Sequence, residues 1–237
     1  MKFLTTTALF SLFWCVNAFA AHHEETPFPW KYSLSIEAET QEMNGLLADS
    51  KQFADSGVLQ KRGASMSVYQ INAGGYEGAN VLTEFYYPDA ASLPSPNVMV
   101  SSQAHLDAFG DNQRAGDFVR STIYKNIHGV IKGDAADVRV FMGASIKALT
   151  PDYVDRVKSL LAANSDGSLA YGINEVIAGG HNGETHVVWW GYASQTAMLL
   201  DLENTEEQFQ EAQKSLAGTR EILRTVVNTS LLTTLPN

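Results

Sequence analysis

The stretch AGGYEG at residues 73–78 returns as AGGHNG at residues 178–183, and a strand-like run rich in aromatic residues follows each copy. The agreement continues without a gap on both sides. It aligns VYQINAGGYEGANVLTEFYY (68–87) with INEVIAGGHNGETHVVWWGY (173–192), which share Ala-Gly-Gly, the following glycine and the final tyrosine. Chance rarely produces such a match, so we interpret the two segments as copies of one hairpin.

A second pair of segments extends this match. FVRSTI (118–123) parallels ILRTVV (222–227), with one arginine in common. We therefore interpret the chain as a tandem duplication with a boundary near residues 133–137. The first copy spans residues 32–133 and the second spans residues 138–235.

Two kinds of loop are rich in glycine, and the sequence that follows separates them. A tight hairpin turn uses glycine because its backbone needs a positive φ angle. A phosphate-binding loop also uses glycine, but a helix begins directly after it. Both glycine stretches here lead into strand-like runs. They therefore predict hairpin turns and argue against a nucleotide site.

Hydrophobic periodicity and capping residues predict the same order of elements, β-α-β-β-α-β, in each half. In the second half we expect a strand at 138–147, a helix from Thr150, strands near 169–177 and 185–192, a helix at 204–218 and a strand at 225–235. In the first half we expect a strand at 32–39, a helix at 41–55, strands at 65–73 and 80–87, a helix around 101–118 and a strand near 121–131.

The order β-α-β-β-α-β is the ferredoxin-like arrangement, an α+β unit in which helices cover one face of a four-stranded antiparallel sheet. Two such units can bury their open faces against each other. The chain then resembles the dimeric α+β barrel group, which includes antibiotic-biosynthesis-type monooxygenases and stress-responsive barrel proteins, with the dimer fused into one chain. The resemblance is one of topology and duplication and assigns no catalytic residue. The alternative is two ferredoxin-like domains without a shared core.

The first residues have the pattern of an export signal. Lys2 precedes the short apolar run ALFSLFWCV, and small residues at Ala18 and Ala20 suit cleavage after Ala20. The only cysteine, Cys15, would leave with residues 1–20, so we expect no disulfide in the mature protein. We expect a protein exported to the periplasm or the medium.

Residues 21–31, AHHEETPFPWK, are expected to form a flexible leader because two prolines and several polar residues cannot build a core. After cleavage the amino terminus would read Ala21-His22-His23. A histidine in third place can bind Cu(II) or Ni(II) together with the terminal amine and backbone nitrogens. His22 and His23 are thus a candidate metal site, and the alternative is a polar tail.

Charge limits the partners that the protein can have. The chain carries 16 basic and 26 acidic side chains, a formal net charge of −10. That balance argues against a nucleic-acid partner, since phosphate binding needs clustered lysine and arginine. No segment is long enough to predict a membrane span, and no motif identifies a cofactor. A small-molecule ligand remains the partner to consider.

A ligand pocket is expected where the two sheets face each other. The hairpin strands offer aromatic side chains that could line it, although alternation alone does not decide which face of each strand meets the helices. The candidate ligand-binding residues are Tyr69, Phe85, Tyr87, Trp189, Trp190 and Tyr192.

The candidate catalytic residues lie in or beside the same hairpins. Glu84 sits among aromatic residues, so burial could raise its pKa and make it a general base. The alternative is that Glu84 faces solvent or pairs with an arginine such as Arg120. His186 is a second candidate base, which Glu175 on the neighbouring strand could orient. Histidines at the edge of a turn are, however, usually solvated.

Three functions follow from these observations. The protein could be an exported binding protein that holds an apolar or aromatic ligand between its sheets. It could be a cofactor-poor oxygenase, isomerase or lyase on the same scaffold, in which case deep burial of Glu84 or His186 beside a cavity is expected. It could also be a structural or partner-binding protein whose aromatic residues only form a core.

Overall fold

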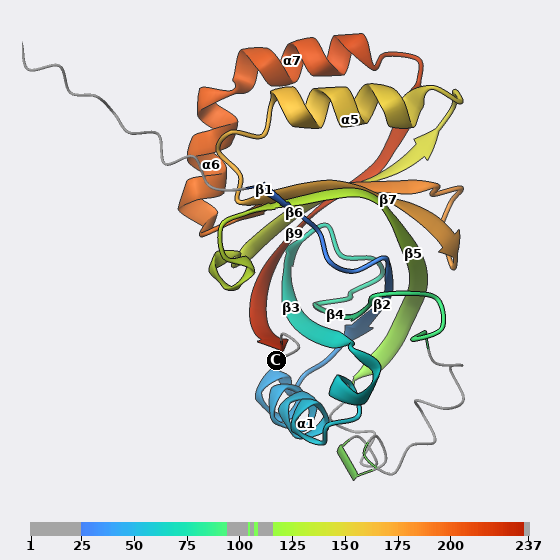
Figure 1. The fold of residues 1–237 in the computed structure, drawn as a ribbon, viewed down its shortest axis with the longest axis vertical. Coiled ribbons are helices and arrows are strands. Elements are labelled where there is room, and N and C mark those ends of the chain that lie inside the picture. Colours follow the sequence, from blue (N-terminus) through green and yellow to red (C-terminus); the bar gives the residue numbers. More distant parts are fainter. Residues whose placement is uncertain (1–24, 94–103, 105–106, 109–115, 235–237) are drawn as a thin grey trace, which may run out of the picture.

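The computed structural model describes residues 25–93, 104, 107–108 and 116–234. These residues form a mixed α+β fold, in which a closed antiparallel barrel of eight strands carries four helices on its outer surface (Figure 1). None of the helices in the described residues has the length and apolar character needed to cross a membrane.

Every strand of the barrel pairs with a neighbour on each side. Around the barrel the order is β5-β2-β4-β3-β9-β6-β8-β7, and β7 pairs with β5 to close the ring. The strands are β2 (Tyr32–Glu39), β3 (Ser65–Ala73), β4 (Val81–Tyr87), β5 (Asp117–Lys132), β6 (Val140–Ala148), β7 (Ala170–Ala178), β8 (His186–Tyr192) and β9 (Arg220–Thr234).

The two halves of the chain have matching strand orders, β5-β2-β4-β3 and β9-β6-β8-β7. Antiparallel pairing of β3 with β9 and of β5 with β7 joins the halves edge to edge. The expected alternative of two independent domains is therefore wrong, because the strands form a single closed sheet. Closure also removes the open edges that an isolated sheet would expose.

Helices cover the barrel on two opposite sides (Figure 1). Helix α1 (Met43–Asp55) packs Leu46 and Phe53 onto the outer face of the first half. Helix α5 (Tyr153–Ala163) packs Val157 and Leu161 onto the second half. The apolar residues of each helix recur at helical spacing and so lie along one stripe.

The end of the second half has one helix more than expected. Helix α7 (Glu206–Ser215) lies where the helix at 204–218 was expected, and α6 (Gln195–Asn204) precedes it and was not predicted. Ser194 caps α6 by accepting a hydrogen bond from the backbone N–H of Ala197 at 3.1 Å. Thr205 separates the two helices.

The two long strands also exceed the expected ranges. β5 begins at Asp117, so the expected helix around 101–118 is wrong at its end, and most of its other positions lie outside the described residues. β9 begins at Arg220 and not at residue 225. Both strands pair with a strand of their own half on one side and of the other half on the other side, which extends their ladders.

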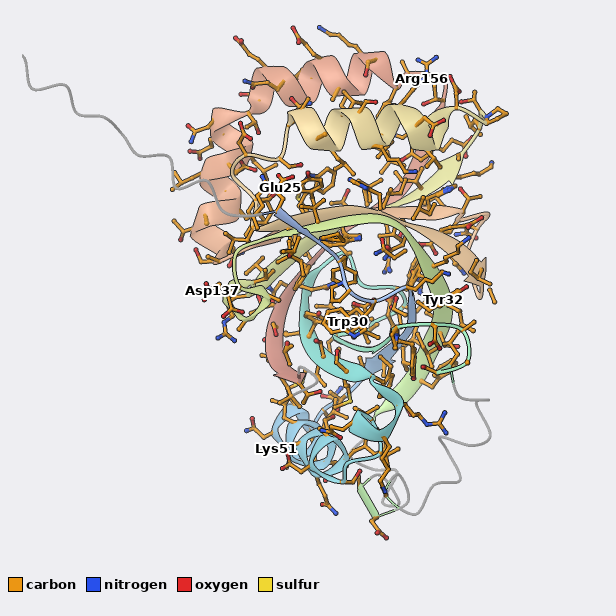
Figure 2. All side chains as sticks on the ribbon, in the orientation of Figure 1. Glu25, Trp30, Tyr32, Lys51, Asp137 and Arg156 are labelled. Atoms are coloured by element: carbon orange, nitrogen blue, oxygen red, sulfur yellow. The ribbon has the colours of Figure 1, made fainter. Side chains whose placement is uncertain are left out.

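The described part of the expected flexible leader is docked. β1 (Glu25–Pro27) pairs with the end of β5, and Trp30 is only 8% exposed. Figure 2 shows Trp30 within the ring of strands. The expectation fails here because the rings of Phe28 and Trp30, centred 5.2 Å apart, bury apolar surface that offsets the cost of ordering the chain. Residues 1–24, including His22 and His23, lie outside the described residues.

The glycine hairpins have a second role that the sequence pattern did not reveal. Gly74 and Gly179 have φ angles of +77° and +80°. A Cβ atom on Gly74 would lie 2.0 Å from the carbonyl oxygen of Thr225, and one on Gly179 would lie 2.1 Å from that of Ser121. Each hairpin therefore touches the backbone of the long strand from the other half.

The close approach predicts that Gly74→Ala and Gly179→Ala each lower the unfolding free energy by about 3 kcal/mol or more. The Cβ atom would push the neighbouring strand away, and alanine would also be strained at a positive φ angle. Gly57→Ala is the matched control, because Gly57 has a φ of +76° and open space around the position of a Cβ atom. Its expected cost is about 1 kcal/mol. Urea unfolding measures both, and equal costs would contradict the interpretation.

Candidate functional site

Alternate side chains of the strands point into the barrel. On β4 these are Leu82, Glu84 and Tyr86, whereas Phe85 and Tyr87 point outward into the core beneath α1. The inward side chains surround a cavity of about 140 Å³. This cavity is the candidate site.

Glu84 anchors a chain of hydrogen bonds inside the cavity. Its Oε1 accepts from the Ser35 hydroxyl at 2.7 Å, and its Oε2 accepts from the Tyr86 hydroxyl at 2.5 Å. The hydroxyl oxygens of Tyr86 and Tyr69 are 2.8 Å apart. Because the proton of Tyr86 points at the carboxylate, the hydroxyl of Tyr69 donates to Tyr86.

The surroundings change the acid strength of this chain. Burial raises the pKa of Glu84, and this outweighs the hydrogen bonds from Ser35 and Tyr86 that favour the charged form. Burial and the nearby charge of Glu84 also raise the pKa of Tyr69 and of Tyr86. Glu84 is therefore a stronger base than an exposed carboxylate.

Aromatic rings form the wall next to this carboxylate. The ring of Phe28 lies 5.3 Å from that of Trp189, and the ring of Tyr69 lies 5.3 Å from that of Phe141. Trp30 lies 5.4 Å from Tyr86. Such tilted and edge-to-face contacts are favourable and hold the rings in place.

Three buried polar atoms along the cavity have no hydrogen-bond partner among the described residues. They are the Oγ of Ser65, the Oδ1 of Asn126 and the Oδ1 of Asn228. Buried polar atoms are normally paired with protein, water or ligand. These atoms therefore mark the polar positions that a bound molecule or ordered water would occupy.

A cluster of charged residues closes one end of the cavity. The Glu37 carboxylate accepts hydrogen bonds from Arg120 at 2.8 Å and from Arg224 at 2.5 and 3.0 Å. Arg120 also pairs with Glu184 at 3.1 Å. The ring of Tyr76 lies against both guanidinium groups, at 4.4 Å from Arg120 and 3.9 Å from Arg224. Two arginines and two glutamates thus balance their charges.

Burial raises the pKa of Glu37, but the hydrogen bonds and charges of Arg224 and Arg120 outweigh it and hold the pKa below its ordinary value. Glu37 is therefore ionised, in contrast to the tendency of Glu84. The shared arginine of FVRSTI and ILRTVV was the sequence signal for this cluster. Sequence reasoning did not connect the two arginines or identify Glu37 as their partner.

The predicted ligand-binding residues divide between two faces of the sheet. Tyr69 and Trp189 line the interior cavity together with Glu84. Phe85 and Tyr87 pack beneath α1. Trp190 and Tyr192 face the side that carries α5, α6 and α7, where they line a different cavity. These four side chains do not lie between the sheets because strand alternation directs them outward.

The other candidate bases lie apart from Glu84. His186 pairs with Glu175 across β8 and β7, on the outer face of the sheet. Its Nδ1 is 2.9 Å from the Thr185 hydroxyl, and its ring lies 5.7 Å from that of Tyr153. Burial lowers the pKa of His186, although the charge of Glu175 opposes this. The predicted catalytic residues therefore do not form one site.

Arg120 is paired with Glu37 and Glu184, so the expected alternative of a Glu84–Arg120 pair is wrong. Within the described part of the chain, no group of three or more His, Cys, Asp and Glu side chains is arranged to hold a metal ion.

No family model matches the chain, and no curated protein matches it. Several solved structures are, however, similar to it. A protein of Fusobacterium nucleatum subsp. nucleatum ATCC 25586, provisionally named a monooxygenase, is similar with a TM-score of 0.60 at 11% identity, covering 87% of this chain and 95% of that one.

Two further structures are similar. A protein of Lactobacillus acidophilus NCFM, also provisionally named a monooxygenase, has a TM-score of 0.55 at 13% identity and covers 90% of this chain and 97% of its own. An anthrone oxidase-like protein has a TM-score of 0.54 at 10% identity, with 89% and 96% covered. At these identities the likeness shows a shared fold.

The raised pKa of Glu84 predicts how Glu84→Gln affects stability. The folded state holds this proton more tightly than the unfolded state, so stability falls as the pH rises from the unfolded pKa, near 4.5, through the folded pKa. A neutral glutamine avoids this loss. Glu84→Gln should therefore raise the unfolding free energy at pH 8 and confer no gain below pH 4.

Urea unfolding over this pH range tests the prediction, with Glu206→Gln on the exposed surface of α7 as the control. A Glu84→Gln effect that is independent of pH would show that Glu84 titrates normally.

The charged cluster predicts a loss of stability in Arg224→Gln of about 3 kcal/mol, because a buried carboxylate loses one of its cations. The side chain of Glu37 is only 4% exposed. The double variant Glu37→Gln/Arg224→Gln leaves Arg120 paired with Glu184 and should recover part of the loss. Thermal unfolding of the variants measures this, and additive losses would contradict the proposed coupling.

Proposed function

We propose that the barrel interior binds a small aromatic molecule with an acidic proton and that Glu84 is the general base that removes this proton. The observation that carries the proposal is a partly buried carboxylate, with a raised pKa, facing a cavity with aromatic walls. A general base works best when its pKa lies near the operating pH, and burial moves Glu84 in that direction.

The size and lining of the cavity support a ligand of about one aromatic ring. An apolar cavity of about 150 Å³ holds benzene, and the volume here is about 140 Å³. Trp189 and Phe141 supply aromatic surface, and the unpartnered Asn126 and Asn228 supply polar atoms. A phenol or a cyclic aryl ketone offers both kinds of group.

The hydrogen-bonded chain supports proton transfer. A C–H or O–H proton of the ligand passes to a carboxylate oxygen of Glu84 and leaves its electron pair on the ligand. The hydroxyl groups of Ser35 and Tyr86 hold the carboxylate in one orientation. Aromatic walls exclude water from the resulting anion, which otherwise would regain its proton.

We propose molecular oxygen as the second reactant. The names of the similar structures, monooxygenase and anthrone oxidase-like protein, support this choice as analogy of fold. The reaction that balances is oxidation of an activated ring methylene to a ketone: one atom of O₂ becomes the carbonyl oxygen, and the other leaves as water with the two methylene hydrogens.

The second candidate is a binding protein without catalysis. The three unpartnered polar atoms and the aromatic wall favour it, because they could select a ligand whether or not Glu84 takes a proton.

We also propose that residues 1–20 direct export and that the halves arose by duplication of a ferredoxin-like unit. The matching strand orders support the latter.

Oxygen uptake tests the enzyme proposal with two probes, 2-indanone and 1-naphthol, whose keto tautomer carries the ring methylene that the reaction needs. The wild-type protein should consume oxygen with one of these probes, and Glu84→Gln should reduce the rate at least about 100-fold. The rate should fall as the pH drops below the raised pKa of Glu84, since the base must be ionised. Glu206→Gln, on the exposed surface, should leave the rate and its pH profile unchanged.

Calorimetric titration of the same probes separates the two candidates. Binding without oxygen uptake in the wild-type protein would favour the binding protein. Glu84→Gln that binds 2-indanone but does not turn it over would favour the enzyme. Absence of both binding and uptake with aromatic probes would overturn the proposal.

A further inference from the structure

A second cavity lies on the other side of the sheet from Glu84. Its volume is about 360 Å³, and it is lined by the outer face of β6, β8 and β9 together with α5, α6 and α7. Figure 1 shows these helices stacked over that part of the sheet. Nothing in the proposed chemistry of the barrel interior uses this space.

The cavity is apolar over most of its surface, and the helices that cover it leave it unfilled. Among its lining residues are Val157, Leu160, Trp190, Leu202, Phe209 and Leu216. Helix α7 contributes no buried residue, and α6 contributes only Met198. Protein interiors are normally close-packed, so an apolar space of this size beneath two loosely seated helices is suited to an apolar guest.

One cation stands at the wall of this cavity without a negative partner. Arg220 is partly buried and donates a hydrogen bond to the neutral Oε1 of Gln213 at 2.6 Å. No salt bridge joins it to a carboxylate in the described part of the chain. Burial lowers the pKa of Arg220, as expected for a partly buried cation without a carboxylate partner. The acid of the lining, Asp201, already accepts a hydrogen bond from Tyr192.

We propose that this cavity binds a carboxylate amphiphile such as a medium-chain fatty acid, with its chain in the cavity and its carboxylate on Arg220. The apolar lining favours the chain through burial of its methylene groups. The planar guanidinium favours a carboxylate, which it can bind through two parallel hydrogen bonds. An alcohol of the same length would gain only the first interaction.

Calorimetric titration of the purified protein with decanoate and with decan-1-ol tests the proposal below their micellar concentrations. Decanoate should bind with one site per chain and more tightly than the alcohol. Arg220→Gln should weaken decanoate binding about tenfold and change decan-1-ol binding less than threefold. Arg139→Gln is the matched control, because the side chain of Arg139 is exposed and Arg139 is not among the residues that line the cavity.

A second pair of variants tests the location. Ala212→Phe places a ring in the cavity from α7 and should abolish binding of both probes. Ala217→Phe adds the same ring at an exposed position outside the lining and should not. Circular dichroism confirms that each variant is folded.

Fluorescence locates the probe independently of these variants. Trp190 lines this cavity, whereas Trp30 and Trp189 line the barrel interior. Quenching by 11-bromoundecanoate should therefore be lost in Trp190→Phe and retained in Trp189→Phe. Failure of decanoate to bind would overturn the proposal. So would binding that survives Ala212→Phe, or quenching that requires Trp189, since the fatty acid would then lie elsewhere.

Discussion

The fold depends on a contact that each half makes with the long strand of the other. Gly74 lies against the backbone of Thr225, and Gly179 lies against that of Ser121. Only a residue without a side chain permits this approach, because a Cβ atom would overlap the carbonyl oxygen. The two hairpin tips then meet, with the rings of Tyr76 and His181 centred 4.9 Å apart. Together with the pairing of β3 with β9 and of β5 with β7, these contacts close the barrel, and the inner faces of both halves become one interior.

Charge stabilises the same junction at some cost. Arg224 belongs to the second half but bonds Glu37 and the carbonyl oxygen of Gly74 in the first. Arg120 belongs to the first half and bonds Glu184 in the second. Removing such charges from water is expensive, so the net stabilisation is small even when the pairs are well formed. Their larger effect is on the specificity of the fold, because any other placement of the two hairpins relative to each other would leave buried charges unpaired.

The sequence predicted the parts of the fold that depend on local patterns. The glycine stretches marked both hairpins, and the order of the strands followed from their periodicity, whereas helix α6 was not predicted. Phe85 and Trp190 were predicted to line the ligand pocket, and this was wrong. Side chains of a strand alternate between its two faces, but the alternation does not say which face meets a helix. That choice depends on tertiary contacts, and both residues lie beneath helices.

Long-range contacts also determine the structure of the segments that were wrongly predicted or missed in the sequence. Residues 25–31 have a composition typical of a flexible leader, but Phe28 and Trp30 find aromatic partners from distant strands inside the barrel. Glu37 gave no local signal, because its arginines come from β5 and β9. Burial of Glu84 could be suspected from its aromatic neighbours, whereas its bond to Ser35 required the register of β2 and β4.

The interior combines polar groups with aromatic surface, and this combination suits the proposed chemistry. Strands β2 and β3 point Ser35, Ser65 and Ser67 inward, whereas β6 and β8 point Phe141 and Trp189 inward. Under the proposed duplication, Glu84 and Trp189 occupy equivalent positions in the two hairpins. One copy then supplies the base with its hydroxyl partners, and the other supplies the aromatic surface against which a ligand would lie. Two identical halves would have placed two carboxylates in this small space, where like charges oppose ionisation. Divergence at this position therefore leaves one carboxylate, Glu84, at the pair of equivalent positions, opposite the aromatic ring of Trp189.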